Sequence, residues 1–176
     1  MVIVEKATSV DCEFIANLHI VSWQQNYDAV LSEKYLNEQI YHERKEIWLQ
    51  RFKSPKENQM VFVAKINDEP VGFICLFGNN HDEHGSIIDN LHVAPDVKGQ
   101  GVGKALMAHA AKWFIDNYPD IGVYLEVLDV NKKAIAFYEY KGAHFIDRSV
   151  WHTPCNNDVD EFLYGWSSAK DLLASC

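Results

Sequence analysis

Three glycines, Gly99, Gly101 and Gly103, stand at alternate positions between an apolar stretch and a run with the spacing of an amphipathic helix. Glycine carries no side chain that would keep a ligand off the backbone, and it adopts backbone angles closed to other residues. Because a helix is expected to begin here, its free N–H groups and positive dipole end face the same point. The stretch therefore predicts a phosphate or pyrophosphate site, with an ordinary strand-to-helix turn as the alternative.

Two well-known phosphate loops do not fit this spacing. A Walker A loop needs glycine at position 98 and serine or threonine at 105, where the chain has Lys98 and Ala105. The dinucleotide fingerprint needs glycine or alanine three residues after its second glycine, but the two registers place Lys104 or Leu106 there. The glycine turn therefore belongs to another class of phosphate loop.

The elements around the turn predict a mixed α/β (α+β) fold. A helix over 102–117 lies between strands at 87–93 and 123–128, and this βαβ order predicts a parallel strand pair. The remaining strands read as hairpins, which predicts a mixed but mostly antiparallel sheet of about seven strands, flanked by about four helices. The other expected strands are 2–4, 60–64, 71–77, 144–151 and 161–166, and the other expected helices follow Thr8, span 32–52 and span 131–142.

Length, charge and composition limit the function classes. A chain of 176 residues that is 48% hydrophobic can bury a substantial core, and we expect one domain over residues 1–176. The net charge of −9 argues against a nucleic-acid partner and favours a cationic one. No apolar run has membrane-spanning length, so we expect no membrane partner.

The cysteines and histidines do not predict a metal centre. The four cysteines are far apart in the sequence, which favours reduced thiols and a cytoplasmic location over disulfides or a zinc site. The tract His81-Asp82-Glu83-His84 has ligand-type side chains, but adjacent residues in a polar loop rarely converge on one ion. We therefore expect no metal.

Two blocks of the sequence resemble the GNAT superfamily of N-acetyltransferases. Lys98 to Gly103 is similar to its pyrophosphate loop, Gln/Arg-x-x-Gly-x-Gly/Ala, with lysine at the first position. Leu125-Glu126-Val127 followed by Asn-x-x-Ala-x-x-Phe-Tyr-x-x-x-Gly over 131–142 is similar to the family's late acetyl-CoA motif. The pattern also resembles the ribosomal-protein alanine N-acetyltransferases, without assigning the acceptor.

The resemblance implies a GNAT-like fold and acetyl-CoA as co-substrate. It implies that the backbone of 91–93 pairs with the pantetheine arm, and that the Leu91 N–H polarises the thioester carbonyl. Asn131 would contact the cofactor, although its place also suits a helix cap. The implied cofactor-binding residues are Leu91, His92, Val93, Lys98, Gly99, Gln100, Gly101, Val102, Gly103, Lys104 and Asn131.

Acetyl transfer to an amine requires a base, because the amine is largely protonated at neutral pH, and it benefits from an acid that protonates the leaving thiolate. Glu126 interrupts an apolar strand, and Tyr138 lies two turns into the following helix, so both side chains can reach one cleft. We assign Glu126 as the base and Tyr138 as the acid. A solvent-facing Glu126 and a core Tyr138 are the alternatives, and Asp89 or water could replace the base.

The predicted function is transfer of an acetyl group from acetyl-CoA to a primary amine of a small molecule or peptide, by direct attack in a ternary complex. The resemblance places Trp23 and Tyr27 beside the acceptor, although aromatic residues at this spacing often only pack in the core. A non-catalytic acyl-CoA sensor and an acyltransferase for a longer acyl-CoA are the alternatives. The sequence leaves a homodimer open.

Overall fold

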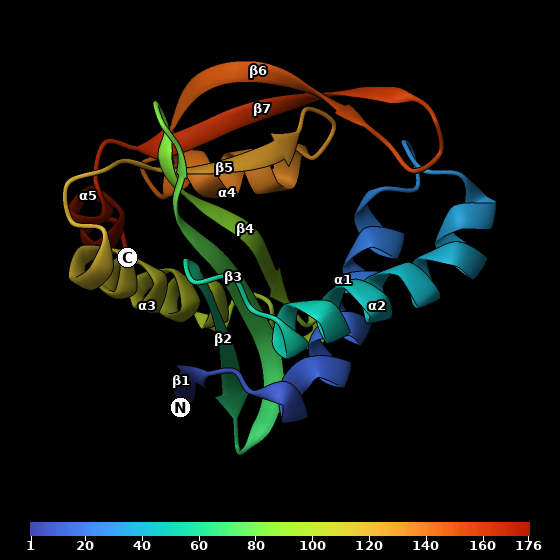
Figure 1. Ribbon diagram of the computed structural model, residues 1–176, viewed down its shortest axis with the longest axis horizontal. Coiled ribbons are helices and arrows are strands. Elements are labelled where there is room, and N and C mark those ends of the chain that lie inside the picture. Colours follow the sequence, from blue (N-terminus) through green and yellow to red (C-terminus); the bar gives the residue numbers. More distant parts are fainter.

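The computed structural model describes residues 1–176 and contains one seven-stranded sheet in the order β1-β2-β3-β4-β5-β7-β6 (Figure 1). All neighbouring strands are antiparallel except β4 and β5. The strands are β1 (Val2–Lys6), β2 (Gln59–Ile66), β3 (Glu69–His81), β4 (Gly85–Val93), β5 (Val123–Leu128), β6 (His144–His152) and β7 (Asp158–Trp166). The predicted mixed fold, its seven strands and its parallel pair are confirmed.

Five α-helices accompany the sheet, one more than predicted. They are α1 (Cys12–Asn26), α2 (Ile40–Lys53), α3 (Val102–Asn117), α4 (Lys132–Tyr140) and α5 (Ala169–Ala174). The additional helix α5 has only six residues, and Ser168 caps it by accepting a hydrogen bond from the Asp171 N–H. Ala169 and Leu172 are buried in the same core cluster as α3, so packing rather than a long apolar repeat defines this helix.

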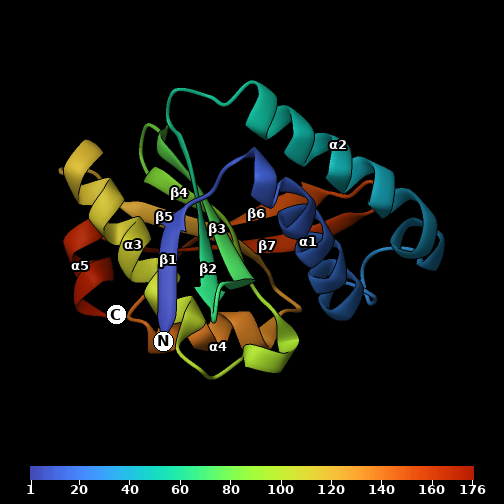
Figure 2. The same cartoon turned by 90° about the horizontal axis from the view of Figure 1, so that it is seen from below.

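The helices form two layers, with α3 and α5 on one face of the sheet and α1 and α2 on the other (Figure 2). Leu106, Met107 and Phe114 of α3 are fully buried in the larger core cluster. On the opposite face, Ile15 of α1 and Trp48 of α2 pack into a second cluster. An apolar stripe through Phe14, Ile15, Leu18 and Val21 is expected from the sequence, but Val21 is 38% exposed. The buried face of α1 passes instead through His19 and Ile20.

The sheet opens between its two parallel strands. β4 and β5 pair only at Ser86 with Val123 and at Ile87 with Tyr124. A register shift between β3 and β4 then leaves Asp89 as an additional residue in β4, and such bulges bend a strand. Beyond this point β4 continues along β3 while β5 continues along β7, and the two strands diverge (Figure 1).

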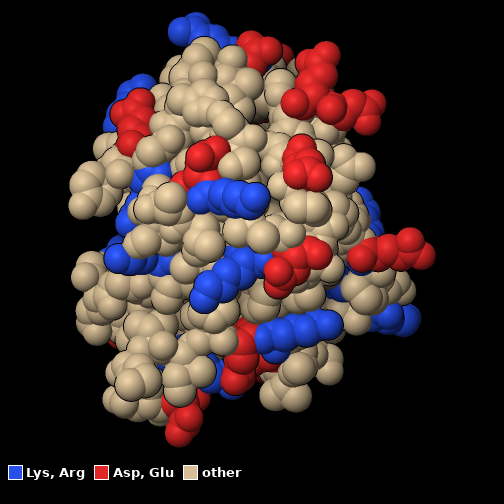
Figure 3. All heavy atoms as spheres, turned by 90° about the vertical axis from the view of Figure 1, so that its left-hand side faces the viewer, with Lys and Arg blue, Asp and Glu red and all other residues tan.

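The surface and the helices give two further observations. No helix is both long and apolar enough to cross a membrane. On the face shown in Figure 3, beside α3 and α5, basic and acidic side chains are interspersed and neither sign covers the surface.

Gly142, which follows the end of α4, provides a test of the local fold. Gly142 has a φ of +74°, and an added Cβ would make only ordinary contacts, the nearest 3.7 Å from the Ser175 Cβ. Gly142→Ala should therefore lower the free energy of unfolding by about 1–2 kcal/mol through backbone strain. Gly142→Asn is the control and should cost less, because asparagine adopts left-handed angles more readily. Denaturant unfolding measures both, and equal stability of the alanine variant and the wild type would contradict the strain argument.

Candidate active site

A cleft of about 980 Å³ lies where β4 and β5 diverge. Residues of α1, α2, β4, the glycine turn, α4 and the β6–β7 region line it. Fourteen sequence-predicted residues are among them: Trp23, Tyr27, Leu91, His92, Val93, Lys98, Gly99, Gly101, Val102, Gly103, Lys104, Glu126, Asn131 and Tyr138. Gln100 is not, since its backbone N–H donates to the Val97 carbonyl and its side chain contacts the Asp96 carbonyl.

The glycine turn presents an open backbone to the cleft. Gly99 and Gly101 both have a φ of +83°, and a Cβ added to either would meet no atom within 4 Å. Gly101 is the residue before α3, so the first free N–H groups of that helix lie at the turn. Lys98 and Lys104 line the cleft beside it. This combination of open backbone, helix N-terminus and two cations suits a phosphate group.

The edge of β4 that faces the cleft carries free backbone groups. The Ala94 N–H donates to the Val71 carbonyl (2.8 Å), on the β3 side of the strand. Successive backbone amides of a strand point to opposite edges, so the N–H groups of Leu91 and Val93 face the gap left by β5. An extended ligand could pair with this edge as an added strand.

Asn131 caps α4, which was one of its two predicted roles. Its Oδ1 accepts a hydrogen bond from the Ala134 N–H (3.2 Å), and the residue also lines the cleft. Gly142 follows the helix, and its N–H donates to the Glu139 carbonyl. These two ends fix the position of Tyr138 between them.

Tyr138 faces the cleft from α4 and is half-buried. Burial, together with the nearby Tyr27, raises the pKa of its phenol. The hydroxyl group therefore keeps its proton at neutral pH and can donate it. Tyr138 also packs against Phe137, with ring centroids 5.4 Å apart, and against the larger core cluster.

Glu126 shares its face of the sheet with a second carboxylate, Glu161. In the β5–β7 register Glu161 lies opposite Leu128, two residues from Glu126, so both side chains point into the cleft. Burial and the charge of Glu126 raise the pKa of Glu161 to about 7. Burial and Asp89 likewise raise the pKa of Glu126. Glu161 was not predicted from the sequence, because only its register opposite Leu128 places it on the same face as Glu126.

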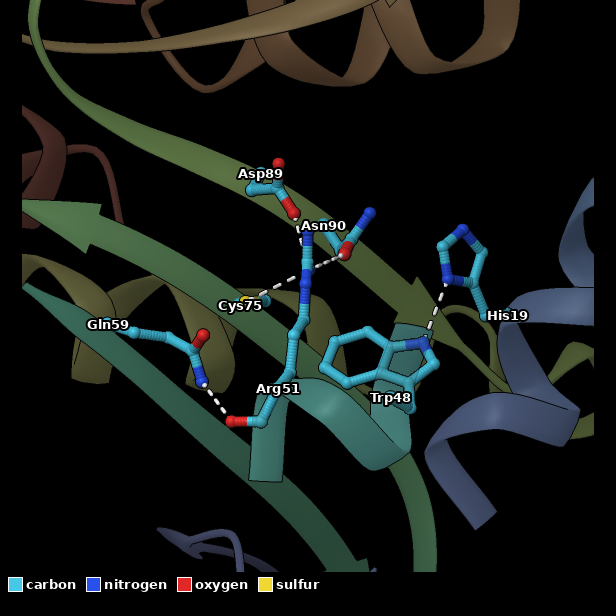
Figure 4. Close-up of polar contacts among 7 residues, drawn as sticks. All are labelled: His19, Trp48, Arg51, Gln59, Cys75, Asp89 and Asn90. Atoms are coloured by element: carbon cyan, nitrogen blue, oxygen red, sulfur yellow. Dashed lines mark hydrogen bonds and ion pairs between the residues drawn. The ribbon is translucent and has the colours of Figure 1, made fainter. Parts of the chain in front are cut away.

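Asp89, the alternative to Glu126 as the base, is held in an ion pair with Arg51. Its Oδ2 accepts a hydrogen bond from Arg51 Nη1 (2.7 Å), and the same nitrogen lies 3.1 Å from Asn90 Oδ1 (Figure 4). The bulge in β4 turns Asp89 towards α2, where this arginine lies. The ion pair occupies the carboxylate and reduces its availability as a base.

Aromatic rings from the end of α1 and from β6 cover one end of the cleft. The Trp23 ring lies 5.1 Å from that of Tyr27 and 5.5 Å from that of Trp151, which the sequence analysis missed. All three also pack against a third buried cluster around Ile20 and Tyr35, so they are core residues and cleft residues at once.

The β6–β7 loop is tied to the segment between α1 and α2. Asn157 Nδ2 donates to the Val30 carbonyl (3.1 Å), and the Ser32 N–H contacts Cys155 Sγ (3.3 Å). Thr153 and Pro154 of the same loop line the cleft. The loop therefore forms a wall of the aromatic end.

The His81–His84 tract forms a turn. Nδ1 of His81 accepts hydrogen bonds from the N–H groups of Glu83 (3.1 Å) and His84 (3.3 Å), and the two imidazole rings stack 4.4 Å apart. No group of three or more metal-ligand side chains comes together in the structure.

The family model described as the acetyltransferase (GNAT) family matches residues 18–145. The chain belongs to this family. The match includes the glycine turn, both strands that border the cleft, Glu126 and Tyr138. Trp151 and Glu161 lie beyond it.

Individual relatives agree with this assignment. The peptidyl-lysine N-acetyltransferase YjaB of Salmonella typhimurium is 40% identical over 82 residues, which are 47% of this chain and 48% of that protein. The match therefore spans about half the length of that relative. A GCN5-related N-acetyltransferase from Rhodopseudomonas palustris has the same fold, with a TM-score of 0.72, 19% identity and 94% of each chain covered. The ribosomal-protein-S18-alanine N-acetyltransferase of Escherichia coli superposes with a TM-score of 0.65 and 19% identity, covering 94% of this chain and 92% of its own.

Gly101 and Gly103 differ in a way that can be tested. Gly101 has a positive φ, whereas Gly103 lies within α3, where an added Cβ would only approach the Phe137 Cζ at 3.6 Å. Gly101→Ala should weaken CoA binding about tenfold, because binding must restore the strained turn. Gly103→Ala is the matched control and should bind nearly as the wild type. Calorimetry measures both affinities, and an unchanged Kd in a folded Gly101→Ala variant would remove the turn from the binding site.

Proposed function

We propose that the protein is an N-acetyltransferase that moves the acetyl group of acetyl-CoA to a primary amine of a small molecule or peptide. The observation that carries the proposal is one cleft with an anion-binding glycine turn at one end and two facing carboxylates, Glu126 and Glu161, among aromatic rings at the other. The first end suits a pyrophosphate, and the second suits an ammonium group. The acetyl group would lie between them, beside β4.

The cofactor half of the proposal assigns three kinds of contact. The open amides of Gly99, Gly101 and Val102 bind the pyrophosphate, with Lys98 and Lys104 adding positive charge. The free edge of β4 from Leu91 to Val93 pairs with the amide groups of the pantetheine arm. The Leu91 N–H donates to the thioester carbonyl and stabilises the oxyanion that forms during attack.

The acceptor half assigns the proton transfer to the carboxylate pair. An alkyl ammonium has a reference pKa of about 10.4, so a proton must leave before the nitrogen can attack. Glu126 and Glu161 share a face of the sheet, and each raises the other's proton affinity when ionised. A pair that titrates near neutral pH can attract the ammonium and accept its proton. Glu126 remains the proposed base, with Glu161 as the coupled second carboxylate.

Tyr138 is the proposed acid. When the tetrahedral intermediate collapses, the C–S bond breaks and the CoA thiolate leaves with the bonding electrons. The neutral phenol of Tyr138 faces the cleft and can give its proton to that sulfur. The attacking nitrogen still carries one extra proton, which passes through water to the Tyr138 phenolate, and Glu126 releases the first proton to solvent. The products are then the N-acetylated amine, free CoA and one proton.

The direct test is a turnover screen with acetyl-CoA across polyamines, amino acids, aminoglycosides and peptides, following release of the CoA thiol. The similar protein YjaB is named a peptidyl-lysine N-acetyltransferase, which makes lysine-containing peptides a priority. A longer acyl-CoA in a parallel screen tests the acyl preference. Tight CoA binding with no turnover of any amine would favour the non-catalytic sensor.

Removal of one hydroxyl group tests the acid. Tyr138→Phe keeps the ring that packs against Phe137 and should lower kcat by about 100-fold, with little change in acetyl-CoA affinity or thermal stability. Steady-state kinetics and thermal unfolding measure the two effects. Near-normal turnover with a lowered melting temperature would make Tyr138 a packing residue.

The pH–rate profile tests the base. Turnover should rise with pH as Glu126 ionises, and this rise should lie above the usual range of a glutamate because burial and Asp89 raise the pKa of Glu126. Glu126→Gln should lower kcat most at neutral pH, and high pH should partly restore it because the amine then arrives deprotonated. Glu161→Gln removes a negative charge that raises the pKa of Glu126, so it should move the profile to lower pH.

Asp89→Asn is the control for these carboxylate variants. Asp89 is paired with Arg51 and raises the pKa of Glu126, so its loss should move the rise of turnover to lower pH without removing that rise. A profile unchanged by Glu126→Gln and Glu161→Gln but altered by Asp89→Asn would move the base to β4.

A further inference from the structure

His19 lies in the wall of the cleft with one ring nitrogen already bound. The indole N–H of Trp48 donates to His19 Nδ1 (3.1 Å; Figure 4). Nδ1 must therefore be the acceptor, and the proton of the neutral ring is on Nε2. Burial and the neighbouring His92, Arg44 and Arg51 hold the pKa of His19 well below its usual range, which keeps the ring neutral.

The Nε2–H of His19 has no hydrogen-bond partner in the protein. The residue is 2% exposed and lines the cleft, and Nε2 points away from Trp48 (Figure 4). An unpaired buried donor is costly, so it needs an explanation beyond packing. The Trp48 indole satisfies the hydrogen-bonding capacity of Nδ1, but no protein group accepts the Nε2–H.

A second unpaired donor lies nearby in the same wall. Arg44 is 9% exposed and pairs with Glu43 through its terminal nitrogen, while its Nε has no partner. Its guanidinium lies 4.4 Å above the Trp23 ring, and that ring meets His19 edge-on at 5.1 Å. Both side chains therefore contact the same half-buried indole.

The charges around these donors indicate what kind of oxygen they suit. Arg44 is paired with Glu43, and Arg51 with Asp89, so both cations are compensated. Glu126 and Glu161 form no ion pair, which leaves this end of the cleft negative. A carboxylate would meet repulsion there, whereas the neutral oxygen of an amide accepts N–H donors without adding charge.

We propose that His19 Nε2–H and Arg44 Nε–H bind an amide carbonyl oxygen of the acceptor, so that the substrate class is an amine that carries a peptide-like carbonyl. The inference rests on the proposed acetyl transfer. The ammonium group is held by Glu126 and Glu161, and the carbonyl is held across the cleft by the two donors. The Trp23 ring, which contacts both donor side chains, turns aside to admit the amide and then covers it.

Three matched amines test this substrate class. Cadaverine, lysine and lysinamide differ only in having no carbonyl, a carboxylate or a carboxamide. We define the selectivity ratio as kcat/KM for lysinamide divided by kcat/KM for cadaverine. The wild type should prefer lysinamide to both other amines by about tenfold.

Two substitutions of His19 separate substrate binding from packing. The amide of asparagine reaches the position of Nδ1, so His19→Asn keeps an acceptor for Trp48 and removes the donor at Nε2. Glutamine reaches the position of Nε2, so His19→Gln keeps that donor and loses the acceptor. The selectivity ratio should fall about tenfold in His19→Asn and stay within about twofold of wild type in His19→Gln. Comparing ratios between variants cancels the intrinsic reactivity of each amine.

Arg44→Lys provides an independent check. It keeps a cation beside Glu43 but has no N–H group at the position of Nε, so the selectivity ratio should fall here too. Thermal unfolding of all variants reports the structural role: a purely structural His19 predicts a stable Asn variant with unchanged selectivity and a destabilised Gln variant. That result would overturn the inference.

The screen distinguishes failure of this inference from failure of the proposed function. A wild-type enzyme that acetylates cadaverine as well as lysinamide, or acetylates other amines but none of these three, would overturn the carbonyl site and leave acetyl transfer intact. Absence of turnover with every amine in the wider screen would overturn both.

Discussion

β4 and β5 can approach closely where their parallel pairing begins because Gly85 and Gly122 have no side chains. A Cβ on Gly85 would lie only 2.3 Å from the Gly122 carbonyl oxygen. The close approach lasts for only two residue pairs. From there β4 follows β3 and β5 follows β7, so one edge of β4 loses its strand neighbour. The cleft, the free backbone groups of Leu91 and Val93, and the inward position of Glu126 all depend on this divergence.

Charge compensation divides the cleft into two chemically different halves. Beside the glycine turn, Lys98 and Lys104 form no ion pair and can meet phosphate groups. At the other end, the two arginines are paired with Glu43 and Asp89, while Glu126 and Glu161 are not paired. An anionic cofactor and a cationic acceptor therefore have only one favourable orientation in the cleft. The electrostatics select this orientation before any specific contact forms.

The elements predicted correctly are those whose ends are marked by local sequence signals, such as a glycine turn or a helix cap. The glycine spacing and the cap at Asn131 gave the turn and α4, and the βαβ order gave the parallel pair. The parts that depend on tertiary contacts were missed. Glu161 becomes a site residue only through its register with β5, Trp151 through packing on Trp23, and the Arg51 pair to Asp89 through a bulge. Strand register and bulges have no local sequence signature strong enough to place these side chains.

The carboxylate pair also argues for a catalytic role over a binding role alone. Burial raises the pKa values of Glu126 and Glu161, and a neighbouring carboxylate adds to each rise, Asp89 at Glu126 and Glu126 at Glu161. The folded state therefore disfavours the ionised form of both side chains. A structure selected only for stability would gain from a neutral residue at either position. A module that only binds an acyl-CoA has no use for carboxylates at the far end from the pyrophosphate. An enzyme that must take a proton from an ammonium group near pH 7 needs a carboxylate with a raised pKa. We infer that the protein keeps these two destabilising carboxylates because the reaction requires them.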